Sequence, residues 1–363
     1  LPISNGLYAR KPTGEIFHYQ SNLSEPDGIS GNRILSIEET ESGLLYVGTG
    51  TAGVDRFLPY GKAFNILLEE SVWKILEDSQ HTIWFCMDGT GVKRYQPKTG
   101  ELQDFSYDAD EKNSVPSDSV FSAAEISEDE IWFGTRRGLW IYDQSIGSGR
   151  RTVFTSPQLD VLNTAQVWEV YEDSRQNIWI GTRNNGLFRL GPLRSDIQQY
   201  QLNSDFVYTV YEDSRERIWV GTIGGGLHLL KRDGSFTVYD EFDNNFILDI
   251  HEDETGLLWI STNGGGLQRF NPANSEFVTY SVEEGLPNNV VYGIQTDKSG
   301  AYWMGSNDGL VQFHPDVMNF DVYTTSDGLP SDEFNGKAFS GAADGRLYFG
   351  GLEGVVYFYP ELI

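Results

Sequence analysis

The sequence predicts an all-β protein built from repeated four-stranded sheets, and three observations carry this prediction. The chain contains nearly the same segment twice, YEDSRQNIWIGTRNNGLFRL at 171–190 and YEDSRERIWVGTIGGGLHLL at 211–230. No segment shows the sustained apolar spacing of three and four residues that is typical of helices. Aligned on one aromatic residue, the repeated pattern recurs eight times, at Tyr46, Trp84, Trp132, Trp179, Trp219, Trp259, Trp303 and Tyr348.

The spacing of these aromatic residues indicates how the sheets are organised. Neighbouring members are 38 to 48 residues apart, and a period of about 43 is typical of β-propeller blades. Each unit offers an apolar first strand such as VYTVYED (207–213), a second strand such as IWVGT, a third strand such as GGGLQRF (264–270) and a looser fourth strand such as EFVTY (276–280). We therefore expect an all-β β-propeller of eight blades, with seven blades and one separate terminal unit as the alternative.

The residues of each blade follow from the packing of sheets around an axis. Both faces of such sheets are buried, so the large ring is expected to fill the wedge between neighbouring blades. A small residue follows two positions later, usually Gly but Cys86 and Ser261 in two units, because the neighbouring blade needs room there. The Asp of EDSRQN, EDSRER and EDETG is expected to accept hydrogen bonds from backbone amides of the first turn.

The two ends of the chain are expected to close the ring. The last blade, residues 337–359, supplies three strands and lacks a fourth, while EIFHYQ at 15–20 has the sequence of a fourth strand. Pairing of these segments would remove exposed sheet edges. The preceding NGLYAR at 5–10 resembles a surplus third strand, so residues 1–20 are expected to be a closing strand with a remnant before it. Residues 1–363 are then expected to form a single propeller domain.

Composition argues against several classes of partner. The chain has 53 acidic and 26 basic residues and a formal charge of −27, which argues against nucleic acid or an anionic membrane surface. The one cysteine, Cys86, excludes an internal disulfide but leaves the cytoplasm and the periplasm both open. No run approaches the ~18 apolar residues of a membrane helix. The first residues lack the features of a signal peptide, so we expect a mature form or an excised piece.

The units WIGTRNNGL, WVGTIGGGL and WISTNGGGL, and the ending DGLPSDEFNGKAFSGAADGRLYFGGLEGVVYFYPELI, resemble the two-component regulator propeller family over essentially the whole chain. The resemblance implies the periplasmic sensor region of a bacterial hybrid histidine kinase or a related membrane receptor, in a family whose known inputs are often carbohydrates. It also implies an immunoglobulin-like domain, a membrane helix and a signalling module downstream. The resemblance leaves open whether the protein forms a homodimer.

One face of the predicted ring is the default ligand pocket. The segment entering the first strand and the turn leaving the second strand lie at the same end of each blade, so these loops converge. Aromatic rings beside amide and charged side chains suit a sugar or another polar ring, although packing between blades is the alternative for any single ring. The expected ligand-binding residues are Trp73, Trp168, Tyr208, Tyr292, Arg136, Arg137, Arg183, Asn184, Asn185, Asn263, Asn307 and Asp308.

Three of these residues suggest the charge of the ligand. GTRRGL (134–139) and GTRNNGL (181–187) place Arg136, Arg137 and Arg183 on equivalent turns of adjacent blades. Guanidinium groups bind carboxylate or sulfate in a two-pronged fashion. We therefore hypothesise an anionic ligand, such as a uronate or a sulfated oligosaccharide, with Trp168 as a stacking platform. Pairing of the arginines with nearby acidic side chains is the alternative.

Other chemistries have weaker support in the sequence. GTGTAG at 48–53 matches a dinucleotide fingerprint but falls between two predicted strands, so it predicts a turn. The five histidines lack metal-ligand spacing, so neither a metal nor a cofactor is expected. A propeller glycoside hydrolase or polysaccharide lyase needs two carboxylates, ~5 to 9.5 Å apart in a hydrolase, and Asp308 with Glu353 is the candidate pair. A protein-interaction scaffold is a further class. We expect a non-catalytic ligand sensor.

Overall fold

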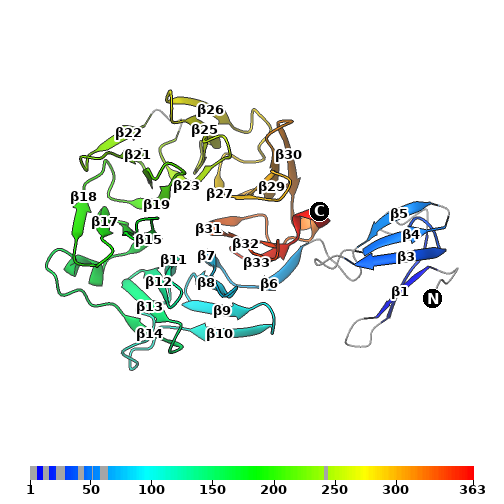
Figure 1. Cartoon of the computed structure of the whole chain (residues 1–363), viewed down its shortest axis with the longest axis horizontal. Coiled ribbons are helices and arrows are strands. Elements are labelled where there is room, and N and C mark those ends of the chain that lie inside the picture. Colours follow the sequence, from blue (N-terminus) through cyan, green and yellow to red (C-terminus); the bar gives the residue numbers. More distant parts are fainter. Residues whose placement is uncertain are drawn as a thin grey trace. The chain divides into compact units, whose positions relative to one another are not determined.

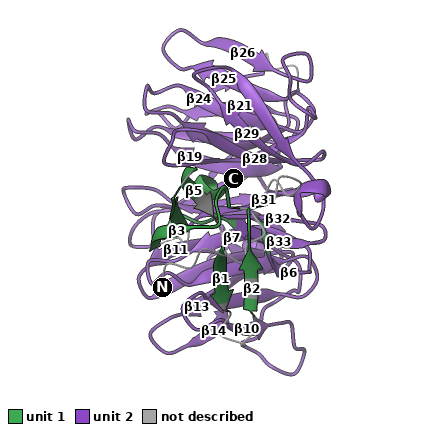
Figure 2. Cartoon of the chain, turned by 90° about the vertical axis from the view of Figure 1, so that its right-hand side faces the viewer, with its two compact units in different colours: residues 1–65, 344–346, 358–363 green, residues 66–343, 347–357 purple. Residues whose placement is uncertain are grey.

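The computed structural model of the protein describes residues 6–10, 16–21, 29–39, 45–50, 52–57, 64–240 and 244–363. The chain divides into two compact units, which Figure 2 shows in different colours. Unit 1 comprises Leu1–Asn65, Asp344–Arg346 and Phe358–Ile363, and unit 2 comprises Ile66–Ala343 and Leu347–Tyr357. The expectation of one domain over residues 1–363 stays a prediction.

Unit 2 is built from sets of four antiparallel strands; five sets form separate sheets, and a parallel bridge between innermost strands joins the first and last sets into one eight-stranded sheet. The first sheet contains β7 (Val72–Glu77), β8 (Ile83–Met87), β9 (Val92–Gln96) and β10 (Glu101–Phe105). The next two contain β11 (Val120–Ser127), β12 (Glu130–Thr135), β13 (Gly138–Asp143) and β14 (Ser148–Arg151), then β15 (Val167–Glu172), β16 (Ile178–Thr182), β17 (Leu187–Leu190) and β18 (Ile197–Tyr200). Within each of these sets of four, every strand pairs with the next strand in the chain, as the repeat predicts.

Three further sheets have the same arrangement. They contain β19 (Val207–Glu212), β20 (Ile218–Thr222), β21 (Gly226–Leu230) and β22 (Phe236–Tyr239), then β23 (Ile247–Glu252), β24 (Leu258–Thr262), β25 (Leu267–Asn271) and β26 (Glu276–Tyr280), and then β27 (Val291–Thr296), β28 (Tyr302–Ser306), β29 (Leu310–His314) and β30 (Asn319–Tyr323).

The last sheet takes its fourth strand from an earlier part of the chain. It contains β31 (Phe334–Gly341), β32 (Leu347–Gly351), β33 (Gly354–Phe358) and, beside β33, β6 (Asn65–Leu68). The prediction that residues 15–20 fill this place is wrong. A sheet edge accepts one neighbour, and β6 reaches it through the short connection 69–71 to β7, which favours local pairing.

The innermost strands of unit 2 surround a common centre (Figure 1). β7, β11, β15, β19, β23, β27 and β31 contact one another in this order, and β31 contacts β7 in turn. Lys337 of β31 also forms a parallel bridge with Lys74 of β7. The strands of each sheet follow one another outward from this centre, so a side chain on an innermost strand can point toward the axis.

Unit 1 contains a strand pair and a three-stranded sheet. β1 (Leu7–Arg10) pairs with β2 (Ile16–Tyr19), and β3 (Ile34–Glu39), β4 (Leu45–Thr49) and β5 (Gly53–Phe57) form the sheet. The fingerprint-like residues 48–53 run from β4 to β5, although residue 51 lies outside the described residues. Tyr46 lies in β4 and is 44% exposed. The Tyr46 sheet belongs to unit 1 and is separate from the sheets of unit 2, and the number of blades stays a prediction.

Within unit 2 the repeated residues pack as predicted. Trp84, Trp219 and Trp303 are fully buried, which fits a ring that fills the space between sheets. A Cβ atom placed on Gly181 would lie 2.7 Å from Val207 Cγ1 of the next sheet. The small residue after the tryptophan is therefore needed because the next innermost strand packs against it.

The Asp of the first turn does more than the sequence predicts. Asp173 Oδ1 accepts hydrogen bonds from Arg175 N (3.0 Å) and Asn177 N (2.8 Å), which confirms the predicted turn. Its second oxygen, Oδ2, accepts a hydrogen bond from Trp179 Nε1 at 2.8 Å. One carboxylate thus accepts hydrogen bonds from both the backbone of the turn and the buried indole ring. The same Asp–Trp bond forms in four other sheets: Asp78–Trp84, Asp213–Trp219, Asp253–Trp259 and Asp297–Trp303.

The described residues contain no α-helix, as predicted. Their helical segments are three short 3-10 turns, η1 (Asp160–Asn163), η2 (Thr325–Asp327) and η3 (Pro360–Leu362). No helix in the described part of the chain is long and apolar enough to cross a membrane.

Candidate ligand-binding face and axial charges

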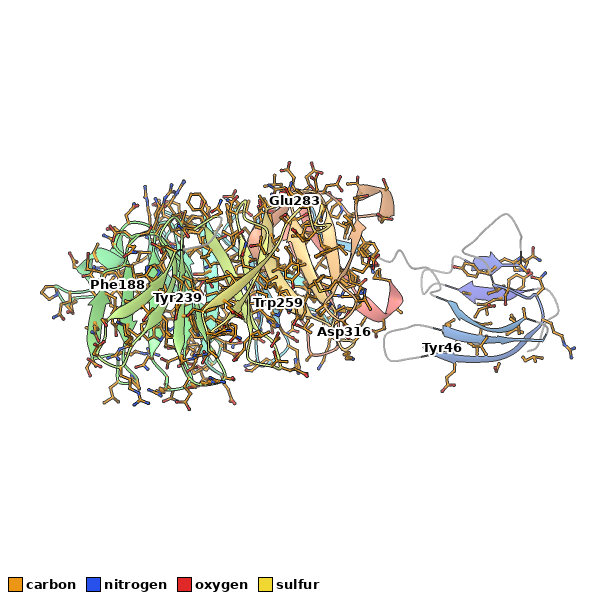
Figure 3. All side chains as sticks on the ribbon, turned by 90° about the horizontal axis from the view of Figure 1, so that it is seen from above. Tyr46, Phe188, Tyr239, Trp259, Glu283 and Asp316 are labelled. Carbon is orange, nitrogen blue, oxygen red and sulfur yellow. The ribbon has the colours of Figure 1, made fainter. Side chains whose placement is uncertain are left out.

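The turns that leave the second strands lie beside the segments that enter the innermost strands, as predicted. Arg136 N donates to Ser119 O at 3.0 Å, and equivalent bonds form at Arg183, Ile223 and Asn263. We call this side of unit 2 the loop face. In Figure 3, Glu283 of the segment entering β27 and Asp316 of the turn after β29 lie on opposite faces of unit 2.

The predicted aromatic platforms pack mainly on one another. Trp168 stacks on Phe121 with ring centroids 4.2 Å apart and planes 5° apart, and Trp73 meets Trp168 edge-on at 5.5 Å. Phe206 also meets Trp168 at 5.1 Å, and Trp168 is only 9% exposed. Because neighbouring rings surround Trp168, this geometry favours a packing role over stacking against a ligand.

The two tyrosines of the predicted set are also engaged. Tyr208 is 5% exposed, and its hydroxyl lies over Gly336, where an added Cβ would come within 1.8 Å of it. Tyr292 donates a hydrogen bond from its hydroxyl to Asn307 Oδ1 at 2.7 Å. Tyr208 thus contacts a part of unit 2 that is distant in the sequence, whereas Tyr292 donates to a turn of its own sheet.

The predicted amide and carboxylate residues are spread over several turns. Asn184, Asn263 and Asp308 are exposed, and Asn185 is half-buried. Asp308 Oδ2 accepts a hydrogen bond from Asn288 Nδ2 at 3.2 Å. These residues belong to three different sheets, and the structure records no contact that joins them into one cluster among the described residues.

Charged side chains gather at the axis, and sequence reasoning missed them. Lys337 Nζ donates to Trp168 O at 2.6 Å and pairs with Glu169 Oε2. It also lies 4.8 Å from the centroid of the Tyr208 ring. β31 neighbours β7 and β27 in the contact order, whereas β15 and β19 are the strands most distant from it. The Lys337 side chain therefore crosses the centre of the ring of innermost strands.

Two further charges belong to this axial cluster. Lys74, Glu169 and Asp249 occupy equivalent register positions, each opposite the small residue that follows the tryptophan of its sheet. Burial raises the pKa of Asp249 to about 7, and the Ile294 backbone amide and Lys74 partly offset this effect. Burial likewise lowers the pKa of Lys337, while Glu169 opposes the change. A sequence signal existed, because these charges interrupt strands that are otherwise largely apolar.

Asp249 is expected to make folding stability depend on pH. Its pKa is raised in the folded state from 3.8 to about 7, so the folded chain holds an extra proton between these values. The free energy of unfolding therefore falls as pH rises through this window, by about 2 to 4 kcal/mol for this group. Urea unfolding at pH 4.5 and pH 8 should show a larger loss for wild type than for Asp249→Asn. Equal losses in the two proteins would show that Asp249 ionises normally.

The three predicted arginines separate into two environments. Arg136 and Arg137 are exposed and make no ion pair among the described residues. Arg183 instead lies over the Phe206 ring, 5.6 Å from its centroid, and its Nη1 approaches Gln166 Oε1 at 3.5 Å. The structure therefore does not join Arg183 to the other two.

A segment that sequence reasoning did not single out lies next to Arg136 and Arg137. Tyr107 and Pro116, from the connection between β10 and β11, line two adjoining pockets of about 300 Å³ each. Arg137 lines both pockets and Arg136 lines one. Pro116 has counterparts in the connections before β27 and β31, Pro287 and Pro330, whereas the residues in the place of Tyr107 there are Val282 and Thr325.

Comparison with known proteins identifies the repeats. The family model described as two component regulator propeller matches residues 161–184, 201–224, 241–264 and 285–308. Each match contains an innermost strand, the following turn and a second strand, including the Asp–Trp pair described above. A stretch of 60 residues is 38% identical to Histidine kinase P4 of Formosa agariphila, and covers 16% of this chain and 4% of that protein.

Solved structures share the fold. The extracellular domain of the putative hybrid two component system BT3049 from B. thetaiotaomicron matches 99% of this chain and 49% of its own chain, at 24% identity and a TM-score of 0.74. A streptogramin B lyase matches 81% of this chain and 97% of its own, at 15% identity and a TM-score of 0.64. The chain thus spans about half of the first structure and a small part of the matched kinase. It carries two-component regulator propeller repeats, as the resemblance of its sequence predicts.

Proposed function

We propose that this chain is the ligand-sensing input region of a bacterial signal-transduction receptor, that it lies outside the cytoplasm and that it has no catalytic activity. The observation that carries the proposal is the series of four matched two-component regulator propeller repeats. The short match to a histidine kinase and the fold match to the extracellular domain of a hybrid two-component system support it. A fold likeness to a lyase adds no support for catalysis, since one fold hosts many functions.

We further propose that the sensor is a seven-bladed propeller. The innermost strands β7, β11, β15, β19, β23, β27 and β31 would each begin one blade, and β6 would complete the last one. Pairing of β6 with β33 covers a sheet edge that would otherwise be open. The Tyr46 sheet would then belong outside this ring, as in the alternative that the sequence left open.

The ligand is proposed to be a carbohydrate or another small polar molecule bound at the loop face. Its binding would change how the propeller packs against a partner copy or against downstream immunoglobulin-like and membrane-linked domains of the same receptor. A ligand can bias such an equilibrium only by its different affinity for the two arrangements. The cluster of packed rings around Trp168 gives the loop face a rigid base, which lowers the entropic cost of binding.

A ligand screen by thermal unfolding tests the proposal. A glycan, amino acid or other metabolite present at 100 times its dissociation constant should stabilise the folded chain by about 2.7 kcal/mol. The compound should remain chemically unchanged during the incubation, as followed by mass spectrometry. Product formation would move the assignment to an enzyme. No stabilisation by any class of small molecule would instead favour a protein partner.

A further inference from the structure

Arg136 and Arg137 form an unusual positive site on the loop face. The chain carries a formal charge of −27, yet neither guanidinium group has an acidic partner among the described residues. The residues equivalent to Arg136 in the other sheets of unit 2 are Asp88, Arg183, Ile223, Asn263, Asn307 and Leu352. Two adjacent unpaired arginines therefore occur at one turn only of this set, which the repeat itself does not require.

The surroundings of these arginines are hollow and contain a flat ring. The two adjoining pockets share Tyr107, Pro116 and Arg137 in their walls. The Tyr107 side chain is 41% exposed, in contrast to the covered rings around Trp168. An exposed ring beside unpaired guanidinium groups offers both an apolar face and charged donors.

Arg151 gives the pocket wall a defined shape. Its Nη2 donates to Ser114 Oγ (2.6 Å) and Asp108 O (3.1 Å), and its Nε donates to Ser114 O (2.9 Å). Its guanidinium group lies 5.4 Å from the centroid of the Tyr107 ring. Arg151 therefore anchors the connection that carries Tyr107, while Arg136 and Arg137 keep their donors for other partners.

One carboxylate, Asp118, also lines the second pocket. Its Oδ1 accepts a hydrogen bond from Tyr107 N at 2.6 Å, so this group serves the same connection. It forms no ion pair with either arginine among the described residues. The two guanidinium groups therefore leave this pocket with net positive charge.

We propose that this double pocket binds an organic anion whose carboxylate or sulfate group pairs with Arg136 and Arg137 and whose ring stacks on Tyr107. The inference rests on the proposed function and specifies the ligand class and the site. It replaces Trp168 with Tyr107 as the stacking ring and excludes Arg183 from the site. Charge-assisted, two-pronged hydrogen bonds provide the selectivity for an anion over its neutral counterpart.

Isothermal titration calorimetry with three simple probes tests this site: glucuronate, its neutral counterpart glucose, and inorganic sulfate. Wild type should bind glucuronate at least tenfold more tightly than glucose at low salt. Arg136→Ala and Arg137→Ala should each weaken glucuronate and sulfate by about tenfold, the usual effect of losing one hydrogen bond to a charged group. Arg183→Ala is the matched control, because it removes an exposed arginine from an equivalent turn, and it should bind both anions like wild type.

Tyr107→Ala tests the contribution of the aromatic ring to binding while leaving both guanidinium groups in place. It should weaken glucuronate about twofold to tenfold and leave sulfate unchanged, because sulfate has no ring to stack. The anion site is refuted if Arg136→Ala, Arg137→Ala and Arg183→Ala bind glucuronate and sulfate with the same affinity. It is also refuted if wild type binds glucose as tightly as glucuronate. A neutral ligand found in the thermal screen would leave the sensor proposal standing in that case. Circular dichroism and thermal unfolding of each variant check that it is folded.

Discussion

Methionine in place of Lys337 is expected to lower the free energy of unfolding by about 3 to 5 kcal/mol. The Lys337 side chain is only 7% exposed and that of its partner Glu169 is 12% exposed. Lys337→Met would leave the Glu169 carboxylate at the axis without its partner, and removal of one member of a buried ion pair costs more than the pair itself contributes. Urea unfolding followed by tryptophan fluorescence measures the change.

The double variant Lys337→Met with Glu169→Gln is the decisive control. It removes both charges, so most of the lost stability should return, because a neutral pair of similar size leaves no unpaired ion. The coupling between the two sites follows from the complete double-mutant cycle. A Lys337→Met variant as stable as wild type would show that Glu169 reaches water, and the axial ion pair would then have no structural role.

Asp213→Ala is expected to destabilise the chain by about 3 kcal/mol. Asp213 Oδ1 accepts hydrogen bonds from Arg215 N and Arg217 N, both at 3.0 Å, and Oδ2 accepts one from Trp219 Nε1 at 2.7 Å. Alanine would leave the buried indole N–H without an acceptor and release the turn, and a buried unsatisfied donor costs about 1 to 3 kcal/mol. Chemical unfolding of the purified variant measures the loss.

Two variants make the Asp213 prediction specific. Asp213→Asn keeps an oxygen for the turn but presents an N–H group to the indole N–H, so it should recover only part of the loss. Asp233→Ala changes an exposed turn aspartate whose Oδ1 accepts from Ser235 N at 2.9 Å, and it should have a small effect. Equal losses at positions 213 and 233 would mean that the bonds of Asp213 Oδ2 to Trp219 Nε1 and to Arg217 Nε contribute nothing beyond the turn.

Much of the fold could be predicted because the residues that determine each sheet lie within one repeat or act on the adjoining one. The aromatic residue, the small residue two positions later and the turn Asp act over a few residues or against the adjoining sheet, so their pattern indicates strand, turn and packing partner. The strand order of the first six sheets of unit 2 follows the repeat directly. The Asp–Trp bond was not predicted, although the constant separation of six residues between the two was visible.

Closure of the last sheet could not be deduced in the same way. EIFHYQ at 15–20 and NILL at 65–68 are both short apolar segments that suit an edge strand, and local pattern does not distinguish between them. β33 pairs with β6 because β6 directly precedes β7 and reaches the gap with a short connection. Which segment pairs with β33 therefore depends on chain connectivity in three dimensions, and the repeated sequence pattern contains no information about it.

The sequence by itself determined the repeating four-stranded sheets, the family of the repeats and the face on which their turns converge, because these depend on interactions within a repeat or between neighbours. Only the tertiary structure decided which side chains meet across the axis and on the loop face. Lys337 pairs with Glu169, which lies 168 residues away in the sequence. Phe121 stacks on Trp168. Tyr107, and not Arg183, lines the same pockets as Arg137. Contacts between distant segments depend on the curvature and closure of the whole ring, so no local pattern encodes them.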